Sequence, residues 1–221
     1  MQIFHGITAV SHEPYANSLR ITALHSVTSL LLIPKIIDFQ QNYPQITVQF
    51  SPSNLLTSFN QQEVDVGIRR GLGQYAGLES RKLTNDSIIL VASPMLLQKK
   101  TIDADSLMKY ALLEDTSNDI QQAILDFCKK YGLNRDQFKS SIKTTDAVPI
   151  VQNALAGLGM AFVSEVLVAD FINDGKLVKI LDYTFDSPET LYLVAPAHHF
   201  NWHKVHCFEK WIMQKLNSTK D

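Results

Sequence analysis

The sequence has few of the features that mark secreted, membrane or metal-binding proteins. It contains two cysteines, Cys128 and Cys207, which lie far apart and match neither a disulfide scaffold nor a zinc-ligand pattern. We expect both to be buried free thiols, as in a protein of the reducing cytosol. No run of 18 apolar residues is present, and residues 1–17 lack the basic start and apolar centre of a signal peptide. The sequence therefore predicts a cytoplasmic protein with no membrane partner.

Positive charge is also scarce. Twenty Lys and Arg residues face 22 Asp and Glu residues, which gives a net charge of −2 at pH 7, and no run of like charges reaches five residues. Phosphate contacts with nucleic acid need clustered Lys and Arg side chains. The chain by itself is therefore not expected to bind DNA. Its 221 residues, 45% of them hydrophobic, are enough for two lobes with sizeable cores.

Catalytic and cofactor motifs are absent too. The sequence holds no G-x-S-x-G, H-E-x-x-H or P-loop pattern. Gly71-Leu-Gly73-Gln-Tyr-Ala76 superficially matches a dinucleotide fingerprint, but turn and strand residues follow it where the pyrophosphate needs a helix. Three histidines and a cysteine between His199 and Cys207 flank the start of the last helix, and we interpret them as solvated side chains, not zinc ligands. We expect no enzymatic activity, no cofactor and no metal.

Apolar patterns alternate between strand and helix along the whole chain, which predicts an α/β protein. We expect a first helix that begins at Ser26 or Thr28 as N-cap, runs to Asn42 and is kinked at Pro34. A later helix should begin at Asp146 and end at Gly157. The other expected helices are 54–62, 118–131, 165–173 and 202–216. The expected strands are 19–24, 46–50, 64–68, 88–92, 111–113, 139–144, 160–163, 176–180 and 191–195.

The order of these elements predicts two lobes, each a mainly parallel sheet with flanking helices. The apolar strands 88–92 and 191–195 are the expected crossovers between the lobes. We therefore expect residues 18–92 and 195–217 to form one lobe and residues 93–192 the other. A ligand would lie in the cleft between them, at the carboxyl ends of the strands.

Hydroxyl groups and an arginine recur at the ends of successive expected strands. The candidate effector-binding residues are Ser26, Thr28, Ser53, Arg69, Thr116 and Thr145. Free N–H groups at helix starts, hydroxyls and a guanidinium together favour a small carboxylate. Each residue on its own is more often just a helix cap, and Arg69 could equally be a hinge residue or part of a surface ion pair, so the prediction rests on their recurrence at the same end of successive strands.

Several motifs follow one another in a characteristic order. They are Leu19-Arg-Ile-Thr, Tyr43-Pro44-x-Ile46-x-Val48, Val64-Asp65-Val66-Gly67-Ile68-Arg69-x-Gly71, Val91-Ala92-Ser93-Pro94, Gly157-x-Gly159-Met-Ala161, Gly175-Lys-Leu177-Val178, Leu191-Tyr192-Leu193-Val194 and Phe208-x-x-Trp211-Ile212. Over about residues 3–216 they resemble the effector-binding domain of LysR-type transcriptional regulators. Arg69-x-Gly71 with Tyr75-x-Gly77 is closest to the subgroup of the glycine-cleavage activator and the β-lactamase regulator.

The resemblance implies a periplasmic-binding-protein-like (type 2) fold that binds a small anionic or zwitterionic effector. It implies a homodimer or tetramer, with the first helix (27–42) as candidate interface. Residues 1–17 resemble the end of the family's linker helix, so DNA would be bound only through a helix-turn-helix domain that this chain lacks. Two alternatives are a solute-binding protein of a transport system and a deaminase-like enzyme of the same two-lobed fold. The missing signal peptide and the missing acid–base pair speak against them.

Overall fold

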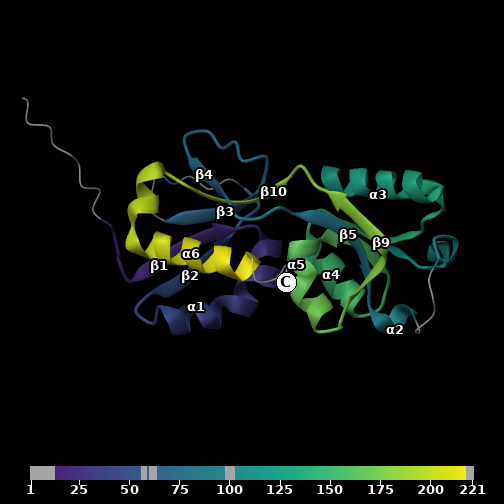
Figure 1. Ribbon diagram of the computed structural model, residues 1–221, viewed down its shortest axis with the longest axis horizontal. Coiled ribbons are helices and arrows are strands. Elements are labelled where there is room, and N and C mark those ends of the chain that lie inside the picture. Colours follow the sequence, from purple (N-terminus) through teal and green to yellow (C-terminus); the bar gives the residue numbers. More distant parts are fainter. Residues whose placement is uncertain (1–12, 56–58, 60–63, 98–102, 218–221) are drawn as a thin grey trace, which may run out of the picture.

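The computed structural model describes residues 13–55, 59, 64–97 and 103–217. Two five-stranded sheets lie one after the other along the long axis, with helices against their faces (Figure 1). The first has the order β2-β1-β3-β10-β4, with strands β1 Ser18–Ala23, β2 Thr47–Pro52, β3 Val66–Gly71, β4 Glu79–Lys82 and β10 Thr190–Ala195. The second has the order β7-β6-β8-β5-β9, with strands β5 Ser87–Ala92, β6 Leu112–Asp115, β7 Ser140–Thr144, β8 Met160–Ser164 and β9 Val178–Asp186.

Helices connect the parallel strands of each sheet. The first lobe is the first sheet with α1 (Ile36–Asn42) and α6 (His203–Asn217). The second lobe is the second sheet with α2 (Pro94–Leu97), α3 (Asn118–Tyr131), α4 (Ala147–Leu155) and α5 (Glu165–Asn173). Short 3-10 turns cover Ile33–Lys35, Asp105–Lys109, Arg135–Gln137 and Ala197–Asn201. The two-lobed α/β architecture predicted from the sequence is confirmed.

The two lobes exchange one strand each. In each sheet four strands run in the same direction, and the strand from the other half of the chain inserts antiparallel: β10 between β3 and β4, and β5 between β8 and β9. The sequence predicts 88–92 in the first lobe and 191–192 in the second, but the sheets place each of these strands in the opposite lobe. A continuous apolar run indicates a buried strand but does not show which of two sheets it joins. The chain crosses between lobes at residues 83–86 and 187–189, the crossing segments.

The first helix starts earlier than expected and is irregular. Helical structure begins at His25, so Ser26 already has helical φ and ψ and its side chain makes no cap hydrogen bond. Val27–Leu32 forms a π-helix, in which the N–H of Ile33 donates to the carbonyl of Thr28 five residues earlier. Pro34 follows directly and has no N–H, so it cannot continue an α-helical ladder. The predicted disturbance at Pro34 is therefore a π-helix followed by a 3-10 turn.

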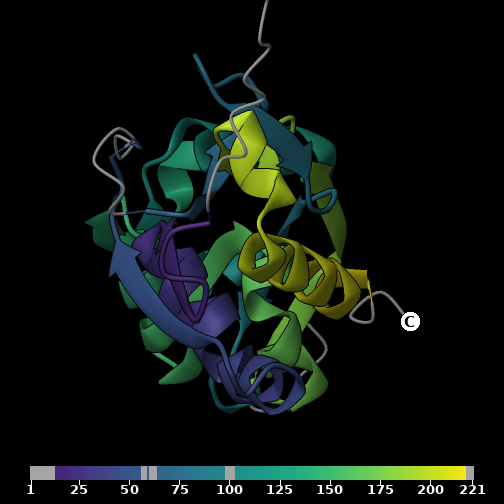
Figure 2. The same cartoon turned by 90° about the vertical axis from the view of Figure 1, so that its left-hand side faces the viewer.

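One hydrophobic core continues from the first lobe into the second. Phe39 of α1 contacts Phe208 and Trp211 of α6 edge-on, with ring centroids 5.9 and 5.3 Å apart. Figures 1 and 2 show α1 and α6 beside each other, and the indole Nε1 of Trp211 donates to Asp38 at 2.7 Å. The same buried cluster reaches α4 and α5 of the second lobe. A smaller core lies under α3 and β9, around Phe127.

A buried ionic cluster joins the start of the described chain to α6. Asp65 is fully buried and binds the guanidinium of Arg20 at 2.8 Å and the ammonium of Lys204 at 3.0 Å. Lys204 is also fully buried, and it donates to the carbonyls of Pro14 and Ser18 at 2.7 and 2.9 Å. Every charge in this cluster is paired and hydrogen-bonded, which is the condition under which buried charges are tolerated.

Two further predictions concern residues 1–17 and the histidines before the last helix. Residues 1–12 of the expected linker remnant lie outside the described residues, and residues 13–17 form a turn before β1. His199 is buried, not solvated: its ring stacks on Trp202 at 3.7 Å, and its Nδ1 lies 2.8 Å from the carbonyl oxygen of Asp65. Burial lowers the pKa of His199 below its usual value, so the ring is neutral at pH 7.

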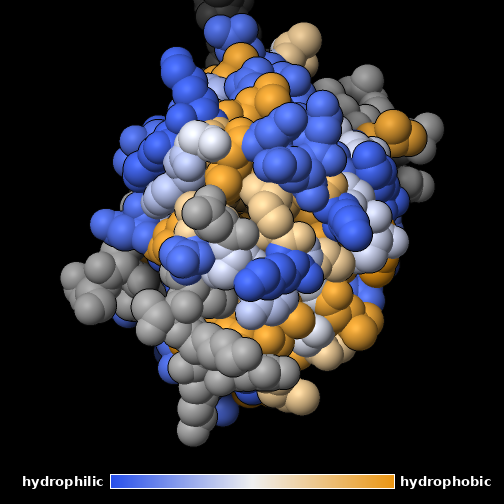
Figure 3. Space-filling view, turned by 90° about the vertical axis from the view of Figure 1, so that its right-hand side faces the viewer, coloured by the Kyte–Doolittle hydropathy of each residue, from blue (hydrophilic) through white to orange (hydrophobic). Residues whose placement is uncertain are grey.

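The surface of the second lobe is mixed. At the end of the molecule seen in Figure 3, hydrophilic side chains surround smaller apolar areas. No helix within the described ranges is long and apolar enough to cross a bilayer.

Replacement of Lys204 by methionine should lower the free energy of unfolding by about 3–5 kcal/mol, because it breaks a fully buried ion pair and leaves two backbone carbonyls without their donor. Urea denaturation followed by circular dichroism measures this change. Lys176→Met is the matched control: its pair with Asp174 is exposed, and surface pairs contribute about 0–1 kcal/mol. Equal effects of the two substitutions would contradict a stabilising role for the buried cluster.

Candidate functional site

A cavity of about 220 Å³ lies in the cleft between the lobes. It is formed where the carboxyl ends of the parallel strands β1 and β3 of the first lobe face those of β6, β7 and β8 of the second. This is the position that α/β folds of this kind use for ligands. The lining residues are Leu24, Ser26, Arg70, Asp115, Ser117, Asp119, Ile120, Thr145, Ala147, Val163, Ser164, Leu167 and Glu189.

Two of the six predicted residues line this cavity together. Ser26 comes from the first turn after β1, and Thr145 lies between β7 and α4 in the other lobe. The α4 helix behind Thr145 is capped as predicted, because the side chain of Asp146 accepts the N–H of Val148 at 2.9 Å. The cleft therefore brings a hydroxyl from each lobe to one space.

Of three other predicted residues, Ser53 and Thr116 bond the local backbone, whereas the buried hydroxyl of Thr28 has no hydrogen-bond partner among the described residues. Thr28 is buried, and its N–H is already bonded to the carbonyl of Leu24 at 2.9 Å. Ser53 forms a local turn, in which its hydroxyl accepts the N–H of Leu55 at 3.2 Å. Thr116 is exposed and donates through both N–H and hydroxyl to the carbonyl of Thr144. None of the three is among the residues that line the cavity.

The sixth predicted residue, Arg69, is replaced at the cavity by its neighbour Arg70. Arg69 is buried in the first lobe, where its guanidinium donates to the hydroxyl of Thr22 at 2.8 Å and to the carbonyl of Leu55 at 3.2 Å. Successive side chains of a strand point to opposite faces of the sheet, so only one of the two arginines can face the cleft. The sequence places both arginines at the end of this strand but does not show which of them faces the cleft.

Arg70 forms the densest set of polar contacts at the cavity. Its guanidinium forms a short ion pair with Asp119 of α3 and lies 3.4 Å from Asp86 and 3.9 Å from Glu189. It also donates to the hydroxyl of Ser187 at 3.2 Å. Asp86, Ser187 and Glu189 belong to the two crossing segments, and Asp119 belongs to the second lobe. One side chain of the first lobe therefore contacts every connection between the lobes.

Two carboxylates near Arg70, Asp86 and Asp115, are desolvated by burial. Burial is the main cause that raises the pKa of Asp86, although Arg70 and the hydroxyl of Ser164 partly offset it. Burial likewise raises the pKa of Asp115, whose side chain accepts the N–H of Ser117 at 2.8 Å. A positive group that enters the cavity would meet Asp115, which lines it, and would favour the charged form of that carboxylate.

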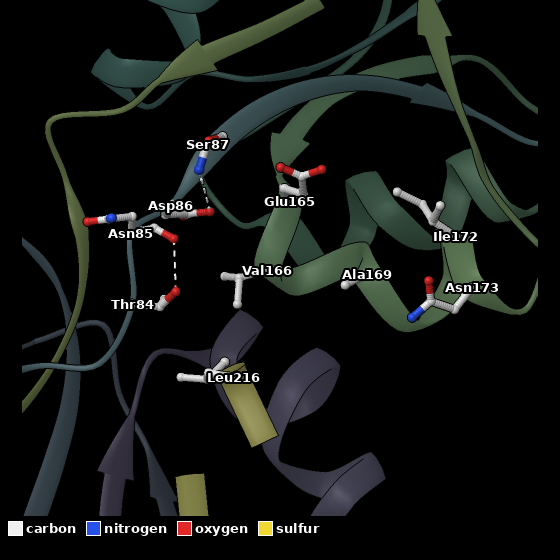
Figure 4. A pocket seen from close by; sticks show the side chains of 10 residues that line it. All are labelled: Thr84, Asn85, Asp86, Ser87, Glu165, Val166, Ala169, Ile172, Asn173 and Leu216. Carbon is white, nitrogen blue, oxygen red and sulfur yellow. Dashed lines mark hydrogen bonds between the residues drawn. The ribbon is translucent and has the colours of Figure 1, made fainter. Parts of the chain in front are cut away.

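A larger cavity of about 460 Å³ lies beside the crossing segment 83–86, against α5 (Figure 4). Val166, Ala169 and Ile172 form one wall. The polar groups on the opposite wall are bonded to one another: the hydroxyl of Thr84 donates to Asn85, and Asp86 accepts the N–H of Ser87. None of the predicted site residues lines it. The cleft cavity is therefore the better candidate, in spite of its smaller volume.

The sequence features that resemble cofactor or metal sites can be located in the structure. The loop with Gly71 and Gly73 leads into the strand β4, and no helix starts there. Within the described ranges, no three His, Cys, Asp or Glu side chains are arranged to hold a metal ion. Cys128 and Cys207 are free and buried, as expected.

The fold and the cleft together define a two-lobed domain of the type that binds small molecules. The family described as LysR substrate binding domain matches residues 12–217, and the chain belongs to this family. The predicted resemblance is confirmed.

The comparisons support the same family at the level of whole relatives. The chain is 26% identical to the glycine cleavage system transcriptional activator homolog of Haemophilus influenzae, over 86% of this chain and 62% of the relative. It is 27% identical to the glycine cleavage system transcriptional activator of Escherichia coli K12, over the whole chain and 73% of the relative. These relatives are named as transcriptional regulators and not as enzymes, as the sequence predicted. The chain spans about two thirds of their length.

Solved structures show the same fold. The effector domain of the regulator AmpR of Pseudomonas aeruginosa superposes with a TM-score of 0.71 at 18% identity, over 91% of this chain and 96% of that one. CrgA, a LysR-type regulator of Neisseria meningitidis, gives 0.69 at 22% identity, over 90% of this chain and 68% of its own.

Replacement of Ser26 by alanine should change the free energy of unfolding by less than about 0.5 kcal/mol, because the hydroxyl caps no helix end. Asp146→Ala, which removes the cap of α4, should cost about 1 kcal/mol. Urea titration of both variants measures the difference. A loss of about 1 kcal/mol for Ser26→Ala would mean that the side chain is structural.

Proposed function

We propose that this chain is the effector-sensing domain of a LysR-type transcriptional regulator and that a small molecule binds in the cleft cavity. The observation that carries the proposal is the convergence of Ser26 and Arg70 from the first lobe with Thr145 and Asp119 from the second. A ligand that contacts both lobes favours one relation between them over another. In the complete protein this change would reach DNA through a helix-turn-helix domain, in the cytoplasm.

The charges around the cavity favour a zwitterion over a simple anion. Asp115, Asp119 and Glu189 line the space, and Arg70 is already shared among carboxylates. An anion would add a negative charge to this set, whereas a zwitterion brings its own cation. The volume of about 220 Å³ lies below the roughly 300–1,000 Å³ of pockets for drug-sized ligands. An amino acid or a molecule of similar size fits these limits.

Family membership favours this function over the transport alternative. The E. coli and H. influenzae relatives are named as activators of the glycine cleavage system, and the AmpR structure is described as an effector domain. These names concern the relatives and support a sensing role here. The effector itself is the subject of the test below.

A thermal-shift screen tests the class of effector. We expect at least one α-amino acid to raise the melting temperature, because a ligand at a hundred times its Kd stabilises the folded state by about 2.7 kcal/mol. The same molecule without its amino group, and the same molecule without its carboxylate, should give little or no shift. For glycine these matched probes are acetate and methylammonium.

Calorimetry with Ser26→Ala then locates the ligand. Loss of one hydrogen bond to a charged group should weaken binding by roughly 1.5–3 kcal/mol. A deaminated acid that stabilises the chain as well as its amino acid would contradict the zwitterion. Equal affinity of wild type and Ser26→Ala would remove Ser26 from the site.

We further propose that the chain forms a dimer through its first helix (27–42), and that the complete protein pairs into a dimer or tetramer. Ile33 and Ile37 lie one turn apart on this helix, and 51% and 65% of their surfaces are exposed. Exposed apolar side chains that adjoin one another are typical of association surfaces.

Sedimentation velocity at tens of micromolar tests this interface. We expect a dimer for the wild-type chain and a monomer for Ile37→Lys, because a charge would be desolvated in the interface. Leu125→Lys on α3 is the control, since Leu125 is 57% exposed but lies on the other lobe. A wild-type monomer, or equal behaviour of the two variants, would contradict this interface.

A further inference from the structure

Arg70 occupies the cavity as a built-in cation. Its guanidinium is the single positive group among the described residues that line the space. Its side chain is only 16% exposed, and that of its partner Asp119 only 4%. In a partly desolvated site, such a pair interacts more strongly than a surface pair and resists screening by salt.

The charges around Arg70 do not balance. One guanidinium is shared by Asp119, Asp86 and Glu189, and Asp115 stands beside Asp119 in the same wall. The carboxylates therefore exceed the cations in the cleft.

The guanidinium is also incompletely bonded. The Nε of Arg70 is buried and has no hydrogen-bond partner among the described residues. A buried donor without a partner is uncommon and costs free energy in the absence of a ligand or water. An arginine that pairs well with a carboxylate uses two parallel N–H groups, so an incoming carboxylate would find donors to use.

From these contacts we propose that the effector inserts into the Arg70–Asp119 pair. The carboxylate of the zwitterion takes the guanidinium of Arg70, and its ammonium group takes the carboxylate of Asp119. This inference rests on the proposed function and names the specificity-determining residues of its site. The charge balance is kept, because Arg70 exchanges one carboxylate partner for another and Asp119 exchanges one cationic partner for another.

Insertion has a mechanical consequence. Arg70 lies on β3 of the first lobe and Asp119 lies at the start of α3 in the second, so a molecule between them must change the separation of these two elements. Asp86 and Glu189 of the crossing segments would stay beside Arg70 when the effector is bound. The effector would therefore act at an ion pair that joins the two lobes.

Chemical complementation tests whether the pair is a replaceable site. In Arg70→Ala, methylguanidinium should bind near Asp119 and be detected by calorimetry and by amide shifts of Ser117 and Asp119. We expect its affinity to exceed that for wild type by roughly tenfold to a hundredfold, the value of one charge-assisted hydrogen bond. The double variant Arg70→Ala/Asp119→Asn should lose this gain.

Lys35→Ala is the matched control, because Lys35 forms an ion pair with Asp170 that also joins the lobes but lies outside the cavity. It should show no gain for methylguanidinium. Equal binding by Arg70→Ala and wild type would overturn the proposal, as would an equal gain in Lys35→Ala.

A second measurement covers the case in which Arg70→Ala does not fold. Nitroxide labels at Lys210→Cys and Leu125→Cys, which are exposed on different lobes, report the distance between the lobes by pulsed electron resonance. Asp119→Asn should broaden or shift this distribution relative to wild type, and Lys35→Met should change it less. An unchanged distance distribution in Asp119→Asn would contradict the proposal that the Arg70–Asp119 pair sets the separation of the lobes.

The proposed function fails separately from this inference. If no amino acid stabilises the chain, the proposed effector class is contradicted, while complementation still tests the pair. If an amino acid binds wild type and Asp119→Asn equally well, the insertion is contradicted and the sensing role stands.

Discussion

Arg70 links the two lobes of this protein through its contacts with both crossing segments and with Asp119. Each lobe completes its sheet with a strand from the other half of the chain, so the polypeptide crosses the gap twice. The residues of the crossings that carry charge, Asp86 and Glu189, both face Arg70. The arginine thus binds the crossings to the first lobe and, through Asp119, to the second.

Asp65 and Asp86 are both buried carboxylates, but they differ in the number of cations that pair with them. Asp65 has two cations of its own, Arg20 and Lys204, and is not among the residues that line the cleft cavity. Asp86 shares a single arginine with its neighbours, and burial raises its pKa. The first arrangement is saturated and stabilises one lobe. The second is under-supplied with positive charge, which is the property that the proposed binding of a zwitterionic effector would use.

The fold could be predicted closely because most elements carry a clear local signal. The helices 118–131 and 165–173 were predicted with the bounds that the structure shows, since apolar spacing and end signals such as Gly132 define them. The strand β4 and the π-helix were missed, because β4 is short and polar and the π-helix depends on hydrogen bonds around Pro34. The expected helix 54–62 falls largely outside the described residues.

The candidate site could be predicted only in part. Strand ends locate the cleft, and Ser26 and Thr145 follow from that rule. The choice between Arg69 and Arg70 depends on which face of β3 meets the other lobe, and the partners of Arg70 come from sequence positions as distant as 86, 119 and 189. No local pattern contains such information, so acidic residues in the crossings were not recognised as partners of the arginine.

The anchoring of the chain near residue 13 sets what a change in the cleft can move. Glu13 accepts the backbone N–H groups of His203 and Lys204, and Lys204 binds the carbonyls of Pro14 and Ser18. These hydrogen bonds fix the polypeptide before β1 to α6, so this segment keeps its position relative to the first lobe. If a ligand in the cleft changes the relation of the lobes as proposed, the second lobe would therefore change its position relative to α6 and to the residues just before β1.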